Sequence, residues 1–293
     1  MRVGIVILPE YRWPAAARLW RAAEAYGFDH AWTYDHIGWR TLVDGPWFDA
    51  VATLTAAATV TERIRLGTLV ASPNLRHPVV FARALLALDD ISGGRFTLGI
   101  GAGAAGGYDN EVVEATELTP RQRVDRFAEF VELTDALLTS DRVDFAGRYY
   151  TAVQARSVPG CVQRPRLPFV VAANGPRGMA VAARHGQGWV TTGPRGEDYA
   201  GWWRGVAQRV EQFEEVLAAR GREPAEVARH ISVDAAPVYS LSSLAAFQDA
   251  LGRAGELGFT DMAVHWPRPD GPYTGSEAVL EQVAAEVLPN RGM

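Results

Sequence analysis

Short apolar runs alternate along this chain with segments in which apolar residues have helical spacing. Residues 64–70 and 96–100 are apolar and rich in strand-favouring residues, and the segment 79–88, which follows Pro78, has helical spacing between them. This order predicts one strand, helix, strand unit. Because strands that are apolar on both faces are typical of a parallel sheet covered by helices, the residues after each strand should gather at one end of the sheet.

The same alternation continues along the chain and predicts eight β/α units. Strands are expected at 3–8, 30–34, 64–70, 96–100, 169–172, 188–192, 231–238 and 260–265. Helices are expected at 14–26, 48–60, 79–88, 120–139, 177–185, 198–220, 242–256 and 275–287. Eight such units indicate an α/β fold of the TIM (β/α)8 barrel type more strongly than an open doubly wound sheet. Residues 141–167 break the rhythm with a small hairpin, and we interpret them as an insertion after the fourth unit of a single domain spanning 1–293.

The segment from Gly101 to Gly106 formally matches the dinucleotide-binding fingerprint Gly-x-Gly-x-x-Gly and follows a predicted strand. In a Rossmann fold a helix opens at the third glycine, whereas here no helix is predicted at that point and the unit stands fourth in the chain. A barrel already accounts for the segment. The Rossmann interpretation is therefore the weaker alternative.

Composition and charge mainly exclude classes of function. The chain is 48% hydrophobic and 22% charged, which is typical of a soluble globular protein, and its net charge of −5 argues against a nucleic-acid partner or a basic membrane-binding face. It contains no lysine, which excludes Schiff-base catalysis and a Walker-type phosphate loop. Cys161 is the single cysteine and has no companion at metal-ligand spacing, so no metal site is predicted. The N-terminus is interpreted as a strand and not as a signal peptide, so a cytoplasmic location is expected.

Small and polar residues follow the predicted strands, at what would be one rim of the barrel. They are Pro9 and Glu10, Asp35 and His36, 70–72, 101–103, 173–175, 191–193, Asp234, and His265 with Trp266. Glycine and alanine let a flat ligand approach the backbone, while Asn, Ser, Thr and backbone N–H groups bind carbonyl or phosphate oxygens. Residues 174–178 lead directly into a helix, so with Arg177 they form a candidate anion site, although a routine strand-to-helix turn explains them equally well.

His36 is the best candidate for a general acid or base. An imidazole beside Asp35 at a barrel rim could hold or deliver a proton near neutral pH, and the alternative is a histidine that only caps its loop. His77 precedes a helix and is interpreted as structural, whereas the role of His265 stays open.

Aromatic residues in the loop after the second predicted strand are candidates for the wall of a substrate pocket. They are Trp39, Trp47 and Phe48. Packing beneath a loop is the usual explanation for such residues.

Several motifs together resemble the luciferase-like monooxygenase superfamily, and more closely its branch that depends on the deazaflavin coenzyme F420. The motifs are AWTYDH at 31–36, TERIRLGTLV at 61–70, RHP at 76–78, LDDISGGR at 88–95, LGIGAG at 98–103, AANGP at 172–176 and GWVTTG at 188–193. The resemblance covers about residues 3–200. It implies a TIM barrel with an insertion, in agreement with the units counted above.

The resemblance also implies a cofactor site at the rim. The ring would lie against Asp35 and His36, with a non-prolyl cis peptide at Leu69–Val70 behind it and the phosphate near the 174–178 segment. The cofactor-binding residues expected are Asp35, His36, Leu69, Val70, Ala71, Ser72, Ala102, Gly103, Asn174, Gly175, Arg177, Gly178, Thr191 and Thr192. Trp39, Trp47 and His265 are assigned to the substrate pocket.

The chain departs from the family pattern beside its glycine motif. Residues 104–106 read Ala-Ala-Gly where sugar-phosphate dehydrogenases of this family carry a catalytic acid, and no lysine is present to bind a substrate phosphate. The tryptophan that often follows Gly-Ala-Gly in relatives is also absent. These departures argue against that specific activity and indicate an atypical, enlarged substrate pocket.

The leading expectation is an F420-dependent oxidoreductase that transfers hydride between C5 of the deazaflavin and a small organic substrate, with His36 handling the accompanying proton. The alternative is an FMN-dependent monooxygenase that uses oxygen on the same barrel, and a third class is a cofactor-free binding or structural barrel. A homodimer is possible. The sequence specifies neither the substrate nor the direction of the reaction.

Overall fold

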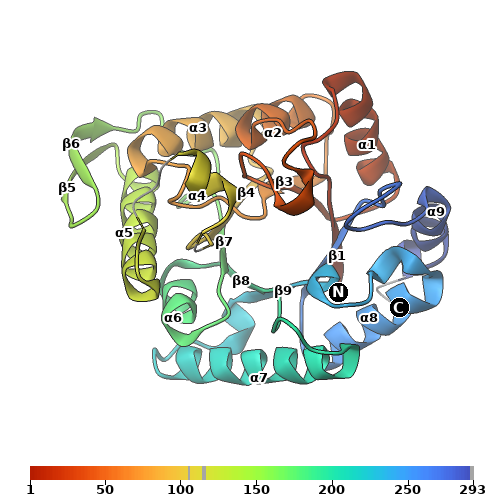
Figure 1. The fold of residues 1–293 in the computed structure, drawn as a ribbon. Helices are drawn as coiled ribbons and strands as arrows, with labels where there is room; N and C mark the ends of the chain where they lie inside the picture. The colour runs from red at the N-terminus through yellow and green to blue at the C-terminus, as the bar shows by residue number, and fades with distance from the viewer. Residues whose placement is uncertain (105, 114–116, 291–293) are drawn as a thin grey trace.

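Eight parallel strands close into a barrel in the computed structural model, which describes residues 1–104, 106–113 and 117–290. Around the barrel the strand order is β1-β10-β9-β8-β7-β4-β3-β2, and helices ring the outside (Figure 1). The barrel strands are β1 (Arg2–Val6), β2 (His30–Thr33), β3 (Arg65–Thr68), β4 (Phe96–Gly101), β7 (Phe169–Ala172), β8 (Gly188–Thr191), β9 (Ala228–Ser232) and β10 (Asp261–His265). The predicted TIM barrel is confirmed.

Several helices begin where the sequence carries a clear start signal, such as a proline or a capping residue. Pro120 opens α5 after Thr119, whose side chain forms a capping box with Gln122, and Pro78 and Pro176 open α3 and α6. The α-helices are α1 (Trp13–Ala25), α2 (Ala50–Ala58), α3 (Pro78–Ile91), α4 (Tyr108–Val112), α5 (Pro120–Thr139), α6 (Pro176–His185), α7 (Tyr199–Ala218), α8 (Leu244–Glu256) and α9 (Glu277–Glu286). Short 3₁₀ helices lie at η1 (Arg40–Leu42), η2 (Pro224–Glu226), η3 (Val233–Ala235), η4 (Ser240–Ser242) and η5 (Leu288–Asn290).

An antiparallel hairpin, β5 (Arg142–Ala146) and β6 (Thr151–Arg156), follows α5 in the chain and stands outside the barrel, beyond that helix (Figure 1). The carboxylate of Glu129 on α5 accepts the backbone N–H groups of Arg148, Tyr149 and Tyr150 at the hairpin turn. The hairpin is therefore tied to the helix that precedes it.

Side chains on the strands divide into two packed layers. Along the first strand and its end, Ile5 and Ile7 pack in the large core between strands and helices, whereas Val6 and Leu8 join a smaller cluster with Trp32. This alternation is the period of two expected for a strand, so the smaller cluster fills the inside of the barrel. It supports the rim from below.

The predicted strand at 231–238 is wrong in its position. β9 ends at Ser232, and the chain turns into η3, because the Asp234 carboxylate accepts the N–H groups of Ser240 at 2.9 Å and of His265 at 2.6 Å. The apolar run in the sequence does not reveal these long-range bonds. Helix α4 is likewise absent from the sequence prediction.

Among the residues described, no helix is both long and apolar enough to cross a membrane.

Candidate active site

His36 lies at the carboxyl end of the barrel and is bound by a carboxylate from α4. Its Nδ1 is 2.5 Å from Oδ2 of Asp109, and Oδ1 of Asp109 accepts the N–H of Ile37 at 2.8 Å. Burial raises the pKa of Asp109, but the hydrogen bonds from His36 and from the backbone of Ile37 and Gly38 outweigh it and hold that pKa below its usual value. Because an ionised carboxylate only accepts, the His36 proton belongs on Nδ1. Nε2 makes no hydrogen bond to any residue the structure describes and is the atom left for chemistry.

The carboxylate expected beside His36, that of Asp35, points elsewhere. Successive side chains of an extended segment point in opposite directions, and Asp35 is buried in a bidentate pair with Arg76, at 3.0 Å to Nε and 2.5 Å to Nη2. Arg76 also contacts Asp49 at 2.6 Å. Asp35 therefore anchors the rim, and the partner of His36 is Asp109, whose only sequence signal was its place in the glycine-rich loop.

The segment 69–72 closes one side of the site. The peptide bond between Leu69 and Val70 is cis, as the resemblance implies. Ala71 is fully buried and pairs with Ile100 in an isolated bridge. Ser72 is also buried, and its hydroxyl makes no hydrogen bond to the residues described, so it can bind a polar group placed against this segment.

The predicted anion site gathers polar groups at the start of α6. The Asn174 amide donates to Thr192 Oγ1 and accepts from Thr191 Oγ1, at 2.8 and 2.7 Å. The first N–H groups of any helix have no intrahelical partner. Helix α6 begins after Gly175 without a side-chain cap, so no capping side chain satisfies these groups. A Cβ at Gly175 would meet nothing within 4 Å, which leaves open space above that turn.

Three arginines border the same part of the rim. Arg177 on α6 is half-exposed and lies 3.7 Å from Asp125 on α5. Arg123 donates to the Gly103 carbonyl at 3.0 Å, and Arg126 donates to Asn74, yet the buried Nε atoms of both have no hydrogen-bond partner among the residues described. A negatively charged ligand would satisfy this side of the site.

The glycine motif brings the backbone close to this basic edge. Gly103 has φ +76°, and a Cβ there would lie 2.5 Å from the Asn74 side chain. Glycine is therefore required at 103 for steric and conformational reasons. Ala102 beside it is partly buried against the core.

A chain of hydrogen bonds begins at Tyr34, whose ring centroid lies 5.8 Å from that of His36. The Tyr34 hydroxyl is 2.7 Å from His265 Nε2, and His265 Nδ1 is 3.0 Å from Asp234. An ionised Asp234 places the imidazole proton on Nδ1, so Nε2 accepts from Tyr34. Burial raises the pKa of Tyr34 well above its usual value. Burial also raises the pKa of Tyr273 to about 12, although the hydrogen bond with Tyr34 acts in the other direction, so both hydroxyls are protonated at neutral pH.

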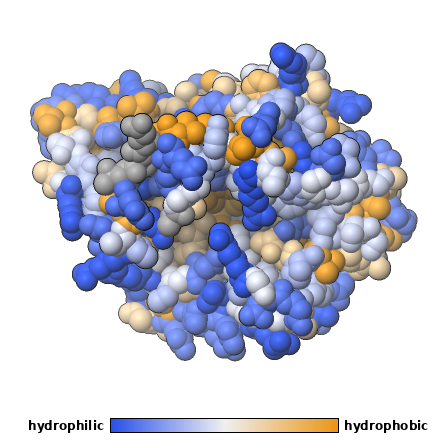
Figure 2. All heavy atoms as spheres, in the orientation of Figure 1, coloured by the Kyte–Doolittle hydropathy of each residue, from blue (hydrophilic) through white to orange (hydrophobic). Residues whose placement is uncertain are grey.

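The residues assigned to the substrate pocket fall at different depths. Trp39 stacks on Tyr273 with ring centroids 5.8 Å apart, and Trp47 donates to the His36 carbonyl at 2.8 Å. His265 is only 1% exposed and lies beneath Tyr273, with centroids 3.7 Å apart. The face seen in Figure 1 is hollowed at its centre (Figure 2).

Comparison with known proteins identifies the family. The family model for luciferase-like monooxygenases matches residues 1–268. The chain belongs to the luciferase-like monooxygenase family. Within this family it is similar to an F420-dependent glucose-6-phosphate dehydrogenase of Kineococcus radiotolerans, with 35% identity over 72% of this chain and 60% of that protein. It is also 28% identical to an uncharacterized protein of Mycobacterium tuberculosis over 98% of this chain and 99% of that protein.

The chain spans about 52–60% of the length of the first curated relatives that it matches. Among luciferase-like structures, the coenzyme F420-dependent tetrahydromethanopterin reductase of Methanopyrus kandleri superposes with a TM-score of 0.77 at 20% identity, covering 98% of each chain. The monooxygenase RslO1 of Streptomyces bottropensis gives 0.79 at 23%, covering 99% of each. At these identities the structural likeness establishes the fold.

Proposed function

We propose that this luciferase-like protein is an F420-dependent oxidoreductase that transfers hydride between the deazaflavin and a small organic substrate, with His36 moving the accompanying proton. The observation that carries the proposal is the 2.5 Å contact of His36 Nδ1 with Asp109, which leaves Nε2 without a hydrogen bond at the rim. The dehydrogenase that is 35% identical over 72% of the chain supports F420 as the cofactor.

His36 has the properties of an acid/base group in this setting. The Asp109 carboxylate fixes the tautomer with the proton on Nδ1, so Nε2 can accept a proton from a substrate hydroxyl, and the same carboxylate then stabilises the imidazolium that forms. In the reverse direction Nε2–H donates. When bound, the deazaflavin supplies the hydride acceptor or donor at C5.

The rim offers groups that fit a phosphorylated cofactor. The uncapped first turn of α6 and Arg177 would hold the phosphate, and Asn174 is locked in place by Thr191 and Thr192. The buried Nε atoms of Arg123 and Arg126 lack partners, which also suits a negatively charged ligand on this side. Segment 69–72 and the glycine motif would lie along the ring.

The substrate class stays broad in this proposal. No acid stands at 104–106, and Asp109, a few residues further along the chain, is bound to His36. The lack of lysine leaves only arginines for a sugar phosphate. Unsaturated carbonyls, imines and ketones, or the corresponding alcohols, suit a hydride acceptor or donor beside a single histidine.

The test mixes the purified protein with reduced F420 and a panel of unsaturated carbonyls, imines and ketones, and with oxidised F420 and alcohols, while deazaflavin absorbance is followed. His36→Ala should lower turnover by about 100-fold or more while F420 affinity changes little, because general acid/base catalysis supplies about that factor. His77→Ala, which removes an exposed histidine at the start of α3, is the matched control.

Unaltered turnover in His36→Ala would remove the acid/base role. Oxygen consumption with reduced FMN, together with no turnover of F420, would replace the proposal with the monooxygenase alternative.

A further inference from the structure

A second cavity lies at the amino-terminal end of the barrel, away from the rim that carries His36. Its volume is about 420 Å³, and each of the eight barrel strands contributes at least one residue to its lining. Gly4 makes room for the His30 ring in its wall, because a Cβ there would lie 1.8 Å from that ring. Side chains usually fill this end of a TIM barrel as part of a packed core, so an open chamber lined by both apolar and polar side chains requires an explanation.

Hydrogen-bond donors and acceptors around the cavity are not matched. The side-chain oxygens of Gln163 and Thr97 already accept hydrogen bonds, whereas several donor groups make none. The Gln163 Oε1 accepts from Arg65 at 3.0 Å, and the Thr97 hydroxyl oxygen accepts from two nitrogens of Arg65 at 3.3 and 3.1 Å. Within the described chain, the Thr97 hydroxyl donates to no acceptor, and Arg65 Nη1 and Gln187 Nε2 make no hydrogen bond. The chamber therefore presents donors that need an acceptor.

His230 adds a further donor inside the chamber. It is 7% exposed and makes no hydrogen bond to any described residue, with Nε2 lying 3.7 Å from the Asp261 carboxylate. Burial lowers the pKa of His230 to about 4, so its ring is neutral at physiological pH and offers one N–H and one acceptor nitrogen.

The two arginines of the chamber, Arg2 and Arg65, differ in whether a carboxylate neutralises their charge. Arg2 is 2.8 Å from Asp261, and its pKa is raised by that hydrogen bond and by the nearby charges of Asp261 and Asp29. Arg65 forms no ion pair with a carboxylate of the described residues, and burial followed by repulsion from Arg2 lowers its pKa, although Asp89 acts in the other direction. A half-buried cation without a carboxylate partner is therefore left on one side.

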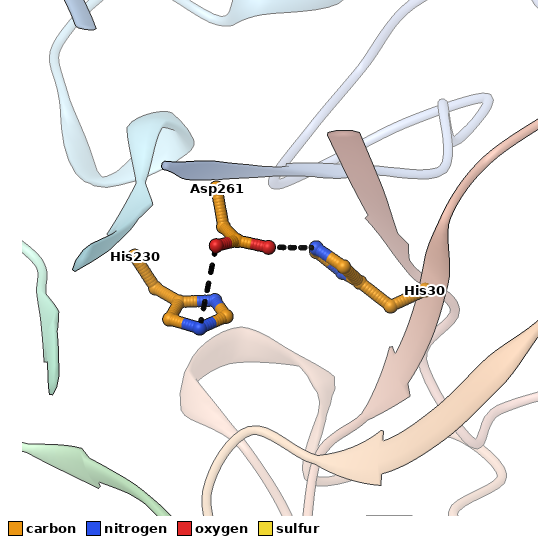
Figure 3. A group of neighbouring side chains, drawn as sticks. All are labelled: His30, His230 and Asp261. Carbon is orange, nitrogen blue, oxygen red and sulfur yellow. Dashed lines mark hydrogen bonds and ion pairs between the residues drawn. The ribbon is translucent and has the colours of Figure 1, made fainter. Parts of the chain in front are cut away.

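The most obvious alternative, a metal ion, does not fit. His30, His230 and Asp261 have ligand atoms within 4.8 Å of one another (Figure 3). However, the indole N–H of Trp32 donates to His30 Nδ1 at 2.6 Å, so the His30 proton sits on Nε2 and is donated to Asp261 at 3.1 Å. A metal at Nε2 would move that proton to Nδ1, where it would face the indole N–H.

We propose that this cavity is a second ligand site that binds a small oxyanion, a carboxylate or a phosphate, through Arg65, Thr97 and His230. The oxyanion supplies the acceptors that the chamber lacks and the negative charge that Arg65 lacks. The chamber is large enough for a small organic acid, and the site is independent of the cofactor proposed at the opposite rim.

The test is calorimetric titration of the full chain with inorganic phosphate and, separately, succinate in a buffer of low anion content. We expect a saturable site, distinct from the one at α6, that Arg65→Gln weakens by about tenfold or more, which corresponds to about 1.4 kcal/mol. Thr97→Val should weaken anion binding less than Arg65→Gln does. If Arg65→Gln does not unfold cooperatively and is therefore misfolded, the Thr97→Val variant still tests the proposal. Arg63→Gln, an exposed arginine outside the cavity, should bind as the wild type does.

The two titrations distinguish an organic acid from a phosphate compound by which anion binds more tightly. Arg177→Gln tests the other anion site, because binding lost in that variant and retained in Arg65→Gln would place the ion at α6 and overturn the proposal. Absence of saturable binding, or equal binding in Arg65→Gln, would show that the chamber holds only water. Saturable zinc binding that His230→Gln abolishes would make it a metal site instead.

Discussion

Asp109 on α4 holds His36 at 2.5 Å across a separation of 73 residues in the chain. The contact depends on the glycine-rich loop after β4, which brings α4 back over the end of β2. It places the imidazole proton on Nδ1 and leaves Nε2 without a hydrogen bond to the residues described. The proposed acid/base group is therefore built from two segments that follow different barrel strands.

Replacing Asp109 by Asn should slow hydride transfer by about 10- to 100-fold, because a misoriented His36 loses part of the about 10²- to 10⁴-fold that general acid/base catalysis supplies. F420 affinity should change little, because Asp109 lies at the histidine and not at the phosphate side. Single-turnover rates and cofactor titration measure the two effects. Asp44→Asn, an exposed carboxylate elsewhere in the loops, is the control, and a normal rate in Asp109→Asn would contradict the role.

The Asp35–Arg76 pair should be a stability element of the rim. Arg76→Gln leaves the buried Asp35 carboxylate without its bidentate partner and should lower the free energy of unfolding by about 3 kcal/mol. Urea unfolding measures the change. Arg253→Gln, which breaks an exposed pair with Asp249, should cost less than about 1 kcal/mol. The double variant Asp35→Asn, Arg76→Gln should recover part of the loss, and full additivity would argue against direct coupling.

Tyr34→Phe should destabilise the protein by about 1–3 kcal/mol, because buried His265 Nε2 loses the Tyr34 hydroxyl donor. Tyr26→Phe is the matched control, since the Tyr26 hydroxyl makes only an exposed 3.4 Å contact with Glu281. Thermal unfolding compares the two variants. Equal effects would mean that the hydrogen bond to His265 contributes little.

His230 should make the fold sensitive to acid. Its pKa is about 4 in the folded protein and about 6.5 in the unfolded chain, so between those values the unfolded state binds more protons and stability falls as the pH is lowered. The loss should reach about 3 kcal/mol at pH 4. His230→Gln should flatten the decline over that range, while His77→Gln, an exposed histidine, should not. Denaturant unfolding at several pH values makes the comparison.

The sequence predicts the barrel because each unit carries its own local signals, such as Pro78 and Pro120 at helix starts and the apolar run of Phe96–Gly101. It also marks His36 and the start of α6, which sit directly after strands. It does not reveal Asp109, because a side chain that reaches across from another loop leaves no periodic signal. The end of β9 is missed for the same reason, since Asp234 is held by His265 from the next strand.

Titration of the protein with F420 and, separately, with FMN, followed by tryptophan fluorescence, tests whether the rim binds the deazaflavin. Trp39 and Trp47 lie at the proposed site, so a bound ring should quench them. The account predicts saturable binding of F420 that is much tighter than that of FMN and that weakens in Arg177→Gln. Preferential binding of FMN, or no binding of either compound, would contradict it.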